Sequence, residues 1–389
     1  MTNAVLFDFD RRSLFPFTFT RPTSEIRVGL LTNREHWESL LEQSVSYLTE
    51  DYLSGKFPVW KDQENLFLNG NVIPDQRLVS AAKELMLGHR LVQNGVPLAA
   101  YAEGWPDPLS PYGRFRDIEY DGPITILKNP WDIFTYCGEA IAKQFEIITK
   151  NKKSAPLSTT NKVIGSGKIF IEEGAKVECS ILNTSTGPIY IGKDAEIMEG
   201  SMIRGPFALC HSATLKMGSK IYGPTVIGPH CKVGGEVNNS VFIGYSNKAH
   251  DGFIGNSVIG EWCNLGADTN NSNLKNNYSE VSVFSIDKST MLPTGLKFCG
   301  VFMGDHAKCG INTMLNTGTV VGVSANIFGT GFPPKYVPSF AWGGFEGTEK
   351  FHIDKAIGLA KEVFGRRQME FDMTEEKLLR KVHELTKSL

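Results

Sequence analysis

The chain has 389 residues, of which 41% are hydrophobic and 21% charged, and its formal net charge is -2. This composition excludes intrinsic disorder, and the length predicts at least two folded domains. The sequence lacks the long Lys and Arg runs of nucleic-acid-binding proteins and the 18-residue apolar stretch of a membrane span. The first ten residues also lack a signal-peptide pattern, so we expect a cytoplasmic protein with neither nucleic acid nor membrane as a partner.

Residues 1–155 have the mixed patterns of an α/β domain. The apolar segments 4–9 and 66–68 are typical of strands, and the apolar spacing over 78–92 is typical of a helix. Seven cysteines are scattered through the whole chain without C-x-x-C spacing. This pattern favours reduced thiols over a disulfide framework and argues against a zinc site.

A hexapeptide repeat runs from about residue 163 to 330. Aliphatic residues recur every six positions, and the residue four positions after each is nearly always small or β-branched. The two phased blocks are Ile191, Ile197, Ile203, Leu209, Leu215, Ile221, Ile227 and Val233, and then Met303, Cys309, Leu315, Val321 and Ile327. A period of six fits neither an α-helix nor an alternating strand. It predicts a left-handed parallel β-helix, with three hexads per coil, in a domain over 156–340.

The repeat breaks twice, at 245–256 and at 268–290. We expect both segments to leave the solenoid as loops, and such loops usually carry the functional site. Beyond the solenoid, 353–364 and 374–388 have helical spacing, and Thr374 is the expected N-cap of the second helix. This C-terminal helical extension over 341–389 should cover the apolar edge of the last coil.

Two segments carry a resemblance to a known family: K-A-H-D-G-F-I-G from Lys248, and G-E-W-C-N-L-G-A-D-T-N-N-S-N-L-K from Gly260 to Lys275. They resemble the bifunctional uridylyltransferases and glucosamine-1-phosphate acetyltransferases that make UDP-N-acetylglucosamine, in particular the variant bacterial and archaeal branch. The resemblance covers most of the chain. It implies a nucleotidyltransferase-like α/β domain followed by a β-helix acyltransferase domain. It also implies a homotrimer that transfers an acetyl group from acetyl-CoA to an amino-sugar 1-phosphate.

The resemblance also implies site residues in the β-helix. His250 matches the family's acetyl-transfer base, and imidazole titrates near neutral pH, where it can accept a proton from an attacking amine. The residues that match sugar-phosphate contacts are Lys248, Asn264, Asn273 and Lys275, and those that match acetyl-CoA contacts are Ala267 and Ala307. Phe253 stands where relatives often have a phosphate-binding Tyr, so the sequence departs from the family there.

In the N-terminal domain, L-F-P-F-T-F-T-R-P from Leu14 and L-N-G-N-V-I-P from Leu68 resemble the family's nucleotidyltransferase motifs. The family's Gly-rich phosphate loop is replaced by D-F-D-R-R from Asp8, and its Mg²⁺-binding Asp by Asn71. The cations that remain for nucleotide phosphates are Arg11, Arg12 and Arg21. Mg²⁺ is the expected cofactor if this domain transfers a nucleotide from UTP or another NTP.

Two other classes of function remain open. A non-catalytic sugar-nucleotide-binding regulatory protein is favoured by the missing Gly-rich loop and by Asn71. A metal-dependent hydratase would use His211, His230 and His250, which are spaced about one coil apart, although we expect no metal. His306 lies at a hexad corner and is a weaker candidate for the base.

Overall fold

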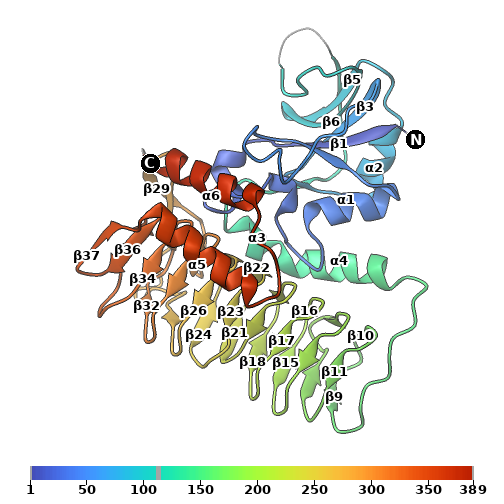
Figure 1. Ribbon diagram of the computed structural model, residues 1–389. Coiled ribbons are helices and arrows are strands. Elements are labelled where there is room, and N and C mark those ends of the chain that lie inside the picture. The colour runs from blue at the N-terminus through green and yellow to red at the C-terminus, as the bar shows by residue number, and fades with distance from the viewer. Residues whose placement is uncertain (1, 111–114, 388–389) are drawn as a thin grey trace. The chain divides into compact units, whose positions relative to one another are not determined.

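The structure is a computed structural model that describes residues 2–110 and 115–387 (Figure 1). It divides into two compact units. Unit 1 comprises Met1–Leu14, Thr18–Ile26 and Leu31–Lys128, and unit 2 comprises Phe15–Phe17, Arg27–Leu30 and Asn129–Leu389. Helices α3 (Asp132–Thr135) and α4 (Cys137–Thr149) therefore fall in the same unit as the repeat region. The domain limits at 155 and 340 remain predictions.

Unit 1 is built on a six-stranded mixed sheet with the order β2-β1-β3-β6-β5-β7. Its strands are β1 (Asn3–Phe7), β2 (Ser46–Leu48), β3 (Glu64–Asn69), β5 (His89–Gln93), β6 (Val96–Glu103) and β7 (Arg116–Glu119). Helices α1 (Asn33–Leu41) and α2 (Gln76–Lys83) pack on it, and β4 (Val72–Ile73) pairs with β8 (Thr125–Ile126). The helix predicted over 78–92 ends at Lys83, because the following turn leads into β5.

Unit 2 is dominated by a parallel β-solenoid whose three faces are parallel sheets (Figure 1). The first face contains β10 (Ile169–Ile171), β13 (Ile189–Ile191), β16 (Phe207–Leu209), β19 (Thr225–Ile227), β22 (Val241–Gly244), β25 (Val258–Glu261), β30 (Val301–Met303), β33 (Thr319–Val321) and β35 (Tyr336–Val337). The second contains β11 (Lys176–Val177), β14 (Glu196–Ile197), β17 (Thr214–Leu215), β20 (Lys232–Val233), β23 (Asn247–Lys248), β26 (Asn264–Leu265), β31 (Lys308–Cys309), β34 (Asn326–Ile327) and β36 (Ala341–Gly344), and ends in the antiparallel β37 (Gly347–Lys350). The third contains β9 (Lys162–Ile164), β12 (Ile181–Asn183), β15 (Met202–Arg204), β18 (Lys220–Tyr222), β21 (Glu236–Asn238) and β24 (Phe253–Gly255), followed by the pair β27 (Asn270–Asn271) and β32 (Met314–Leu315).

The hexapeptide pattern predicted the interior of this solenoid. Every aliphatic residue of the two phased blocks is at most 5% exposed and belongs to one continuous core cluster. The coils continue to Gly344, further than the predicted limit near 330. The predicted fold class, an α/β region followed by a left-handed parallel β-helix with C-terminal helices, is confirmed.

The prediction of two loops was wrong for the first break in the repeat. Residues 245–256 stay in the stack and form β23 and β24. The coil is shortened instead: 18 residues separate the paired Ala208 and Val226, whereas 15 separate Val226 and Val241. The second break begins inside the stack with β27. The chain then leaves the solenoid for the hairpin of β28 (Ser282–Ser285) and β29 (Thr290–Pro293), and returns at β30.

The two C-terminal helices lie along the side of the solenoid and not over its end (Figure 1). They are α5 (Ile353–Gly365) and α6 (Met373–Thr386). Phe364 of α5 stacks on Trp262 with a distance of 3.9 Å between ring centroids, and His383 of α6 meets Phe340 edge-on at 4.9 Å. The expected end cap is therefore wrong, because aromatic side chains on a solenoid corner provide a lateral docking surface.

The start of α6 also differs from the sequence prediction. Its N-cap is Asp372, whose carboxylate accepts hydrogen bonds from the backbone N–H groups of Thr374 and Glu375. Thr374 lies inside the first turn and is not the cap. A carboxylate at this position satisfies two free amides and also opposes the helix dipole favourably.

Candidate functional site

His250 lies at the tip of an exposed corner between β23 and β24. The corner spans 249–252 and ends at Gly252, whose φ is +118°. A Cβ at Gly252 would collide with the backbone carbonyl oxygen of Thr269 on the next coil, so this turn requires glycine. The pattern K-A-H-D-G therefore encodes a tight corner that leaves the imidazole in solvent.

The next coil places Ala267 at the level of His250. The pairing of Asn247 with Asn264 fixes this register, and the backbone N–H of Asp268 donates to the carbonyl of Asp251 at 3.0 Å. Ala267 is half-buried, and Asn264 is exposed on the outer side of β26. Two of the predicted site residues thus lie on the coil that stacks directly on the His250 corner.

Asn273 and Lys275 make contacts within their own region. The Asn273 side chain donates to Oδ1 of Asn256 at 2.8 Å, at a solenoid corner beyond β24. The Lys275 ammonium donates to the carbonyl of Glu280 at 2.5 Å and so ties together the start of the inserted segment. Asn273 therefore lies next to the end of β24, whereas Lys275 is engaged in the insertion.

The structure does not support a cofactor contact for Ala307. Its side chain is fully buried, and its carbonyl accepts the backbone N–H of Asn264 at 3.1 Å. Ala307 precedes β31, so it lies at the opposite end of the second face from the His250 corner. The residue is a small interior companion of the hexad ladder, and this explains why it is small.

Lys248 is also placed differently from the prediction of a sugar-phosphate contact. Its side chain is 1% exposed and points into the solenoid interior. The ammonium donates to the backbone carbonyls of His250 at 2.6 Å and Asp251 at 3.2 Å. Burial lowers the pKa of Lys248 to about 8, an effect that the carboxylates of Asp251 and Asp268 oppose. Lys248 therefore contacts the backbone of the catalytic candidate and not solvent.

The interior positions of two polar residues were not predicted from the sequence. Lys248 occupies the ladder position between Val233 and Leu265, and Asn271 is buried after Ile254 on the third face. Asn271 accepts the backbone N–H of Gly255 at 2.7 Å and donates to its carbonyl at 3.0 Å. The missed signal was the replacement of an aliphatic residue by a polar one in two successive coils around His250.

The histidines of the metal hypothesis do not converge within the chain. The rings of His211 and His230 lie 5.1 Å apart before β20, whereas His250 follows β23 at the other end of the same face. Burial, together with His211 and Arg367, lowers the pKa of His230. Within 2–110 and 115–387, no group of three or more His, Cys, Asp or Glu side chains is arranged to hold a metal. His306 is 7% exposed and lies in an aromatic stack, so it does not face solvent as His250 does.

Unit 1 has a cavity of about 440 Å³ at the carboxyl end of β1. Asp8, Tyr47, Lys61 and Trp105 are among its lining residues, and the Lys61 ammonium lies 5.5 Å from the Trp105 ring centroid. A neighbouring cavity of about 480 Å³ shares Asp8 and is lined by Arg11 and other residues. Carboxyl ends of parallel strands are where open α/β sheets bind ligands.

The Asp8 carboxylate is already occupied by groups of the chain itself. Its Oδ1 accepts the backbone N–H of Thr23 at 2.7 Å and the Thr23 hydroxyl at 2.9 Å, and its Oδ2 accepts the hydroxyl of Thr49. The Nε of Arg11 lies 3.4 Å from Oδ2 of Asp8. Burial raises the pKa of Asp8, and the contacts with Thr49, Arg11 and Thr23 oppose this effect. These hydrogen-bond donors therefore bind a carboxylate of the chain itself, whereas the amides of a Gly-rich loop would bind a phosphate.

The three candidate phosphate-binding arginines differ in accessibility. Arg11 and Arg12 both line the second cavity, and Arg12 is exposed. Arg11 is paired with Asp8 and Glu50 and donates to the Tyr52 hydroxyl at 3.0 Å. Arg21 is 4% exposed. Arg12 is therefore the most exposed of the three arginines.

Asn71 does not fit a Mg²⁺ site. Its side chain is fully buried, accepts the backbone N–H of Phe9 at 3.2 Å and donates to the carbonyl of Leu127 at 3.0 Å. Both polar atoms are thus engaged in holding the backbone, and an amide supplies no charge to balance a divalent cation. The expected Mg²⁺ cofactor has no ligand at this position.

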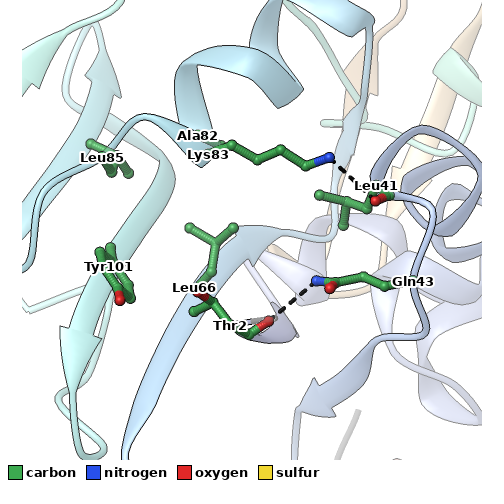
Figure 2. Close-up of a pocket in the computed structure, with 8 residues that line it drawn as sticks. All are labelled: Thr2, Leu41, Gln43, Leu66, Ala82, Lys83, Leu85 and Tyr101. Carbon is green, nitrogen blue, oxygen red and sulfur yellow. Dashed lines mark hydrogen bonds between the residues drawn. The ribbon is translucent and has the colours of Figure 1, made fainter.

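A smaller cavity of about 220 Å³ lies near the start of β1 (Figure 2). Lys83 donates to the carbonyl of Leu41 at 3.2 Å, and Gln43 to that of Thr2 at 3.3 Å. The remaining lining is mostly apolar, as the side chains of Leu66 and Leu85 illustrate. With these amine and amide groups already bonded to backbone, the cavity offers few polar contacts to a ligand.

Comparison with a family model bears on the class of protein. Residues 4–153 match the family model described as sugar nucleotidyl transferase. This match and the relative described next support the resemblance drawn from the sequence, and they support a transferase. Within the described residues, no helix has both the length and the apolar character needed to cross a membrane.

A curated relative then makes the resemblance more specific. The chain is 29% identical over 217 residues to the bifunctional sugar-1-phosphate nucleotidylyltransferase/acetyltransferase of Sulfurisphaera tokodaii. The match covers 55% of this chain and 47% of the relative, so the chain spans about half the length of that protein. Among solved structures, the polysialic acid O-acetyltransferase OatWY is 12% identical with a TM-score of 0.28, covering 49% of this chain and 87% of that one. LpxA, a UDP-N-acetylglucosamine acyltransferase of Bacteroides fragilis, is 13% identical with a TM-score of 0.22, covering 58% and 96%.

Proposed function

We propose that the solenoid transfers an acetyl group from acetyl-CoA to the amine of an amino-sugar 1-phosphate, with glucosamine-1-phosphate as the expected acceptor. The observation that carries this proposal is the exposed imidazole of His250 on a glycine-terminated corner, where the hexad interior turns polar. The relative's nucleotidylyltransferase and acetyltransferase name supports both the acyl group and the sugar phosphate.

The chemistry needs one proton transfer at this corner. The neutral amine of the sugar attacks the thioester carbonyl, its C–N bond forms as the C–S bond breaks, and the thiolate of CoA departs. The ring of His250 accepts the proton that the amine loses and returns it to the sulfur or to solvent. A positioned base of this kind contributes about 10² to 10⁴ in rate. Ala267 on the adjacent coil is the proposed contact for acetyl-CoA, and the exposed Asn264 is the proposed contact for the sugar phosphate.

We further propose that the active form is a homotrimer in which another copy covers the His250 corner. In later coils the same corner column contains Ile311 and Phe345, which are 71% and 66% exposed. Exposed apolar side chains in one column are typical of an interaction surface. Size-exclusion chromatography with light scattering should give three times the 43.0 kDa chain mass, and a monomer with full activity would contradict the trimer.

The test of the base is His250→Ala with purified protein, acetyl-CoA and glucosamine-1-phosphate. The rate should fall at least about 100-fold, while the thermal unfolding temperature stays unchanged because the side chain is exposed. His211→Ala is the matched control, since His211 is an exposed histidine at the other end of the same face. Equal activity of both variants and the wild type would eliminate the proposed base. Absence of acetyl transfer in the wild type itself, together with bound metal, would favour the hydratase.

For unit 1, nucleotidyl transfer is the activity that the family model suggests, and nucleotide binding without transfer is the second candidate. The internal bonds of Asp8 and Asn71 favour the second. Incubation with UTP, N-acetylglucosamine-1-phosphate and Mg²⁺ decides between the two: no pyrophosphate release, with calorimetric binding of UDP-N-acetylglucosamine retained, would establish binding without transfer. Mg²⁺-dependent pyrophosphate release would instead establish nucleotidyl transfer.

A further inference from the structure

Lys248 combines two features that ordinary core packing does not explain. On the second face it takes the inward position that Val233 occupies one coil earlier and Leu265 one coil later. Its side chain is nevertheless a cation and is 1% exposed. Burial of an ammonium group is strongly unfavourable unless strong partners compensate. A residue of this kind at a ladder position therefore calls for a specific partner.

The partners of the ammonium are both in the His250 corner. It donates to the carbonyl of His250 at 2.6 Å and to that of Asp251 at 3.2 Å. The Asp251 carbonyl also accepts the backbone N–H of Asp268 at 3.0 Å. The charged hydrogen bonds hold two successive peptide groups of one tight turn from the inside, and such bonds are roughly twice as strong as neutral ones.

We propose that Lys248 is a positioning residue that fixes the His250 corner, so that the imidazole is held where the acceptor amine and the thioester meet. This rests on the proposed function of His250 as the base. Holding the carbonyls of His250 and Asp251 fixes the two peptide groups that follow the Cα of His250, and Gly252 closes the same turn. Without the ammonium, the carbonyl of His250 would lose this charged partner and that of Asp251 would keep only the N–H of Asp268, so the corner would rearrange. A displacement of about 1 Å at a catalytic group can cost 10²-fold in rate.

The test compares Lys248→Met with the wild type, because an unbranched apolar side chain fits the aliphatic ladder and removes only the ammonium. Labelled histidine ring signals, with His250 assigned from His250→Gln, report on the corner directly. We expect the His250 signal to move and the turnover rate to fall about 10-fold to 100-fold, with KM for glucosamine-1-phosphate changed less than about threefold. Lys248→Gln, which keeps a donor, should lie between the two and covers a failure of the Met variant to fold.

Lys308→Met is the matched control. Lys308 is a second lysine of this face with a lowered pKa; it is half-buried and donates to the carbonyl of His306 at 2.9 Å, at the other end of the same face. Its removal should leave the His250 signal in place. An unmoved His250 signal with turnover within twofold of the wild type in Lys248→Met would overturn the positioning role. If His250→Gln keeps full acetyl transfer, the base proposal fails, and the ring signals alone still decide whether Lys248 fixes the corner.

Discussion

The buried ammonium of Lys248 makes the stability of the solenoid depend on pH in a way that can be calculated. Burial lowers the pKa of Lys248 in the native protein to about 8, whereas an unfolded chain has a lysine pKa of about 10.4. Between these values the unfolded chain binds more protons than the native one, so the free energy of unfolding rises with pH. Because one pKa unit corresponds to about 1.36 kcal/mol, the full effect is about 3 kcal/mol.

The assay is chemical denaturation of the wild type and of Lys248→Met at a series of pH values from 7 to 10.5. The difference between their free energies of unfolding isolates this residue, because Lys308 and the tyrosines with shifted pKa values are present in both proteins. We expect the wild type to gain about 3 kcal/mol over the variant across this range. A difference that stays constant within 1 kcal/mol would show that folding does not lower the pKa of Lys248, and the predicted pH dependence would be refuted.

Two further predictions concern the C-terminal helices. Phe364→Ala should destabilise the docking of α5 by about 3 to 5 kcal/mol, because the ring is 3% exposed and stacked on Trp262. Hydrogen exchange over 353–387 measures this loss, and unchanged protection would contradict the prediction. Asp372→Ala should lower the free energy of unfolding by about 1 kcal/mol, because the N-cap of α6 is lost, whereas Thr374→Ala should change it little. Thermal denaturation of both variants measures this, and the reverse order would identify Thr374 as the cap.

The solenoid could be predicted because its signal is local and repeated. The ladder from Ile191 to Val233 fixes the strand and corner positions of successive coils without knowledge of any distant contact. The phase was lost after Val233, because the coil there is three residues shorter and the pattern alone does not tell a shortened coil from a loop. Residues 245–256 therefore looked like a loop although they pair as strands.

The same loss of phase explains the error at Lys248. Whether Lys248 faces inward or outward depends on its register with Val233, which the shortened coil conceals, so an interior lysine was expected to contact the sugar phosphate. His250 needed no register, because the tip of a glycine-terminated corner is exposed in any case. The docking of Phe364 on Trp262 joins residues about a hundred positions apart, and no local pattern contains that contact.

The lateral helices change how the solenoid should behave as a polymer of coils. In a simple solenoid each coil touches only its neighbours, so fraying can start at the free end and proceed one coil at a time. Here a single segment reaches from the carbonyl of His230, through Arg367, to the ring of Phe340, through His383. This segment therefore connects several coils along the side of the solenoid. Unfolding of the last coil then requires the release of contacts near the middle of the stack. This stretch should therefore unfold more cooperatively than a solenoid that loses one coil at a time.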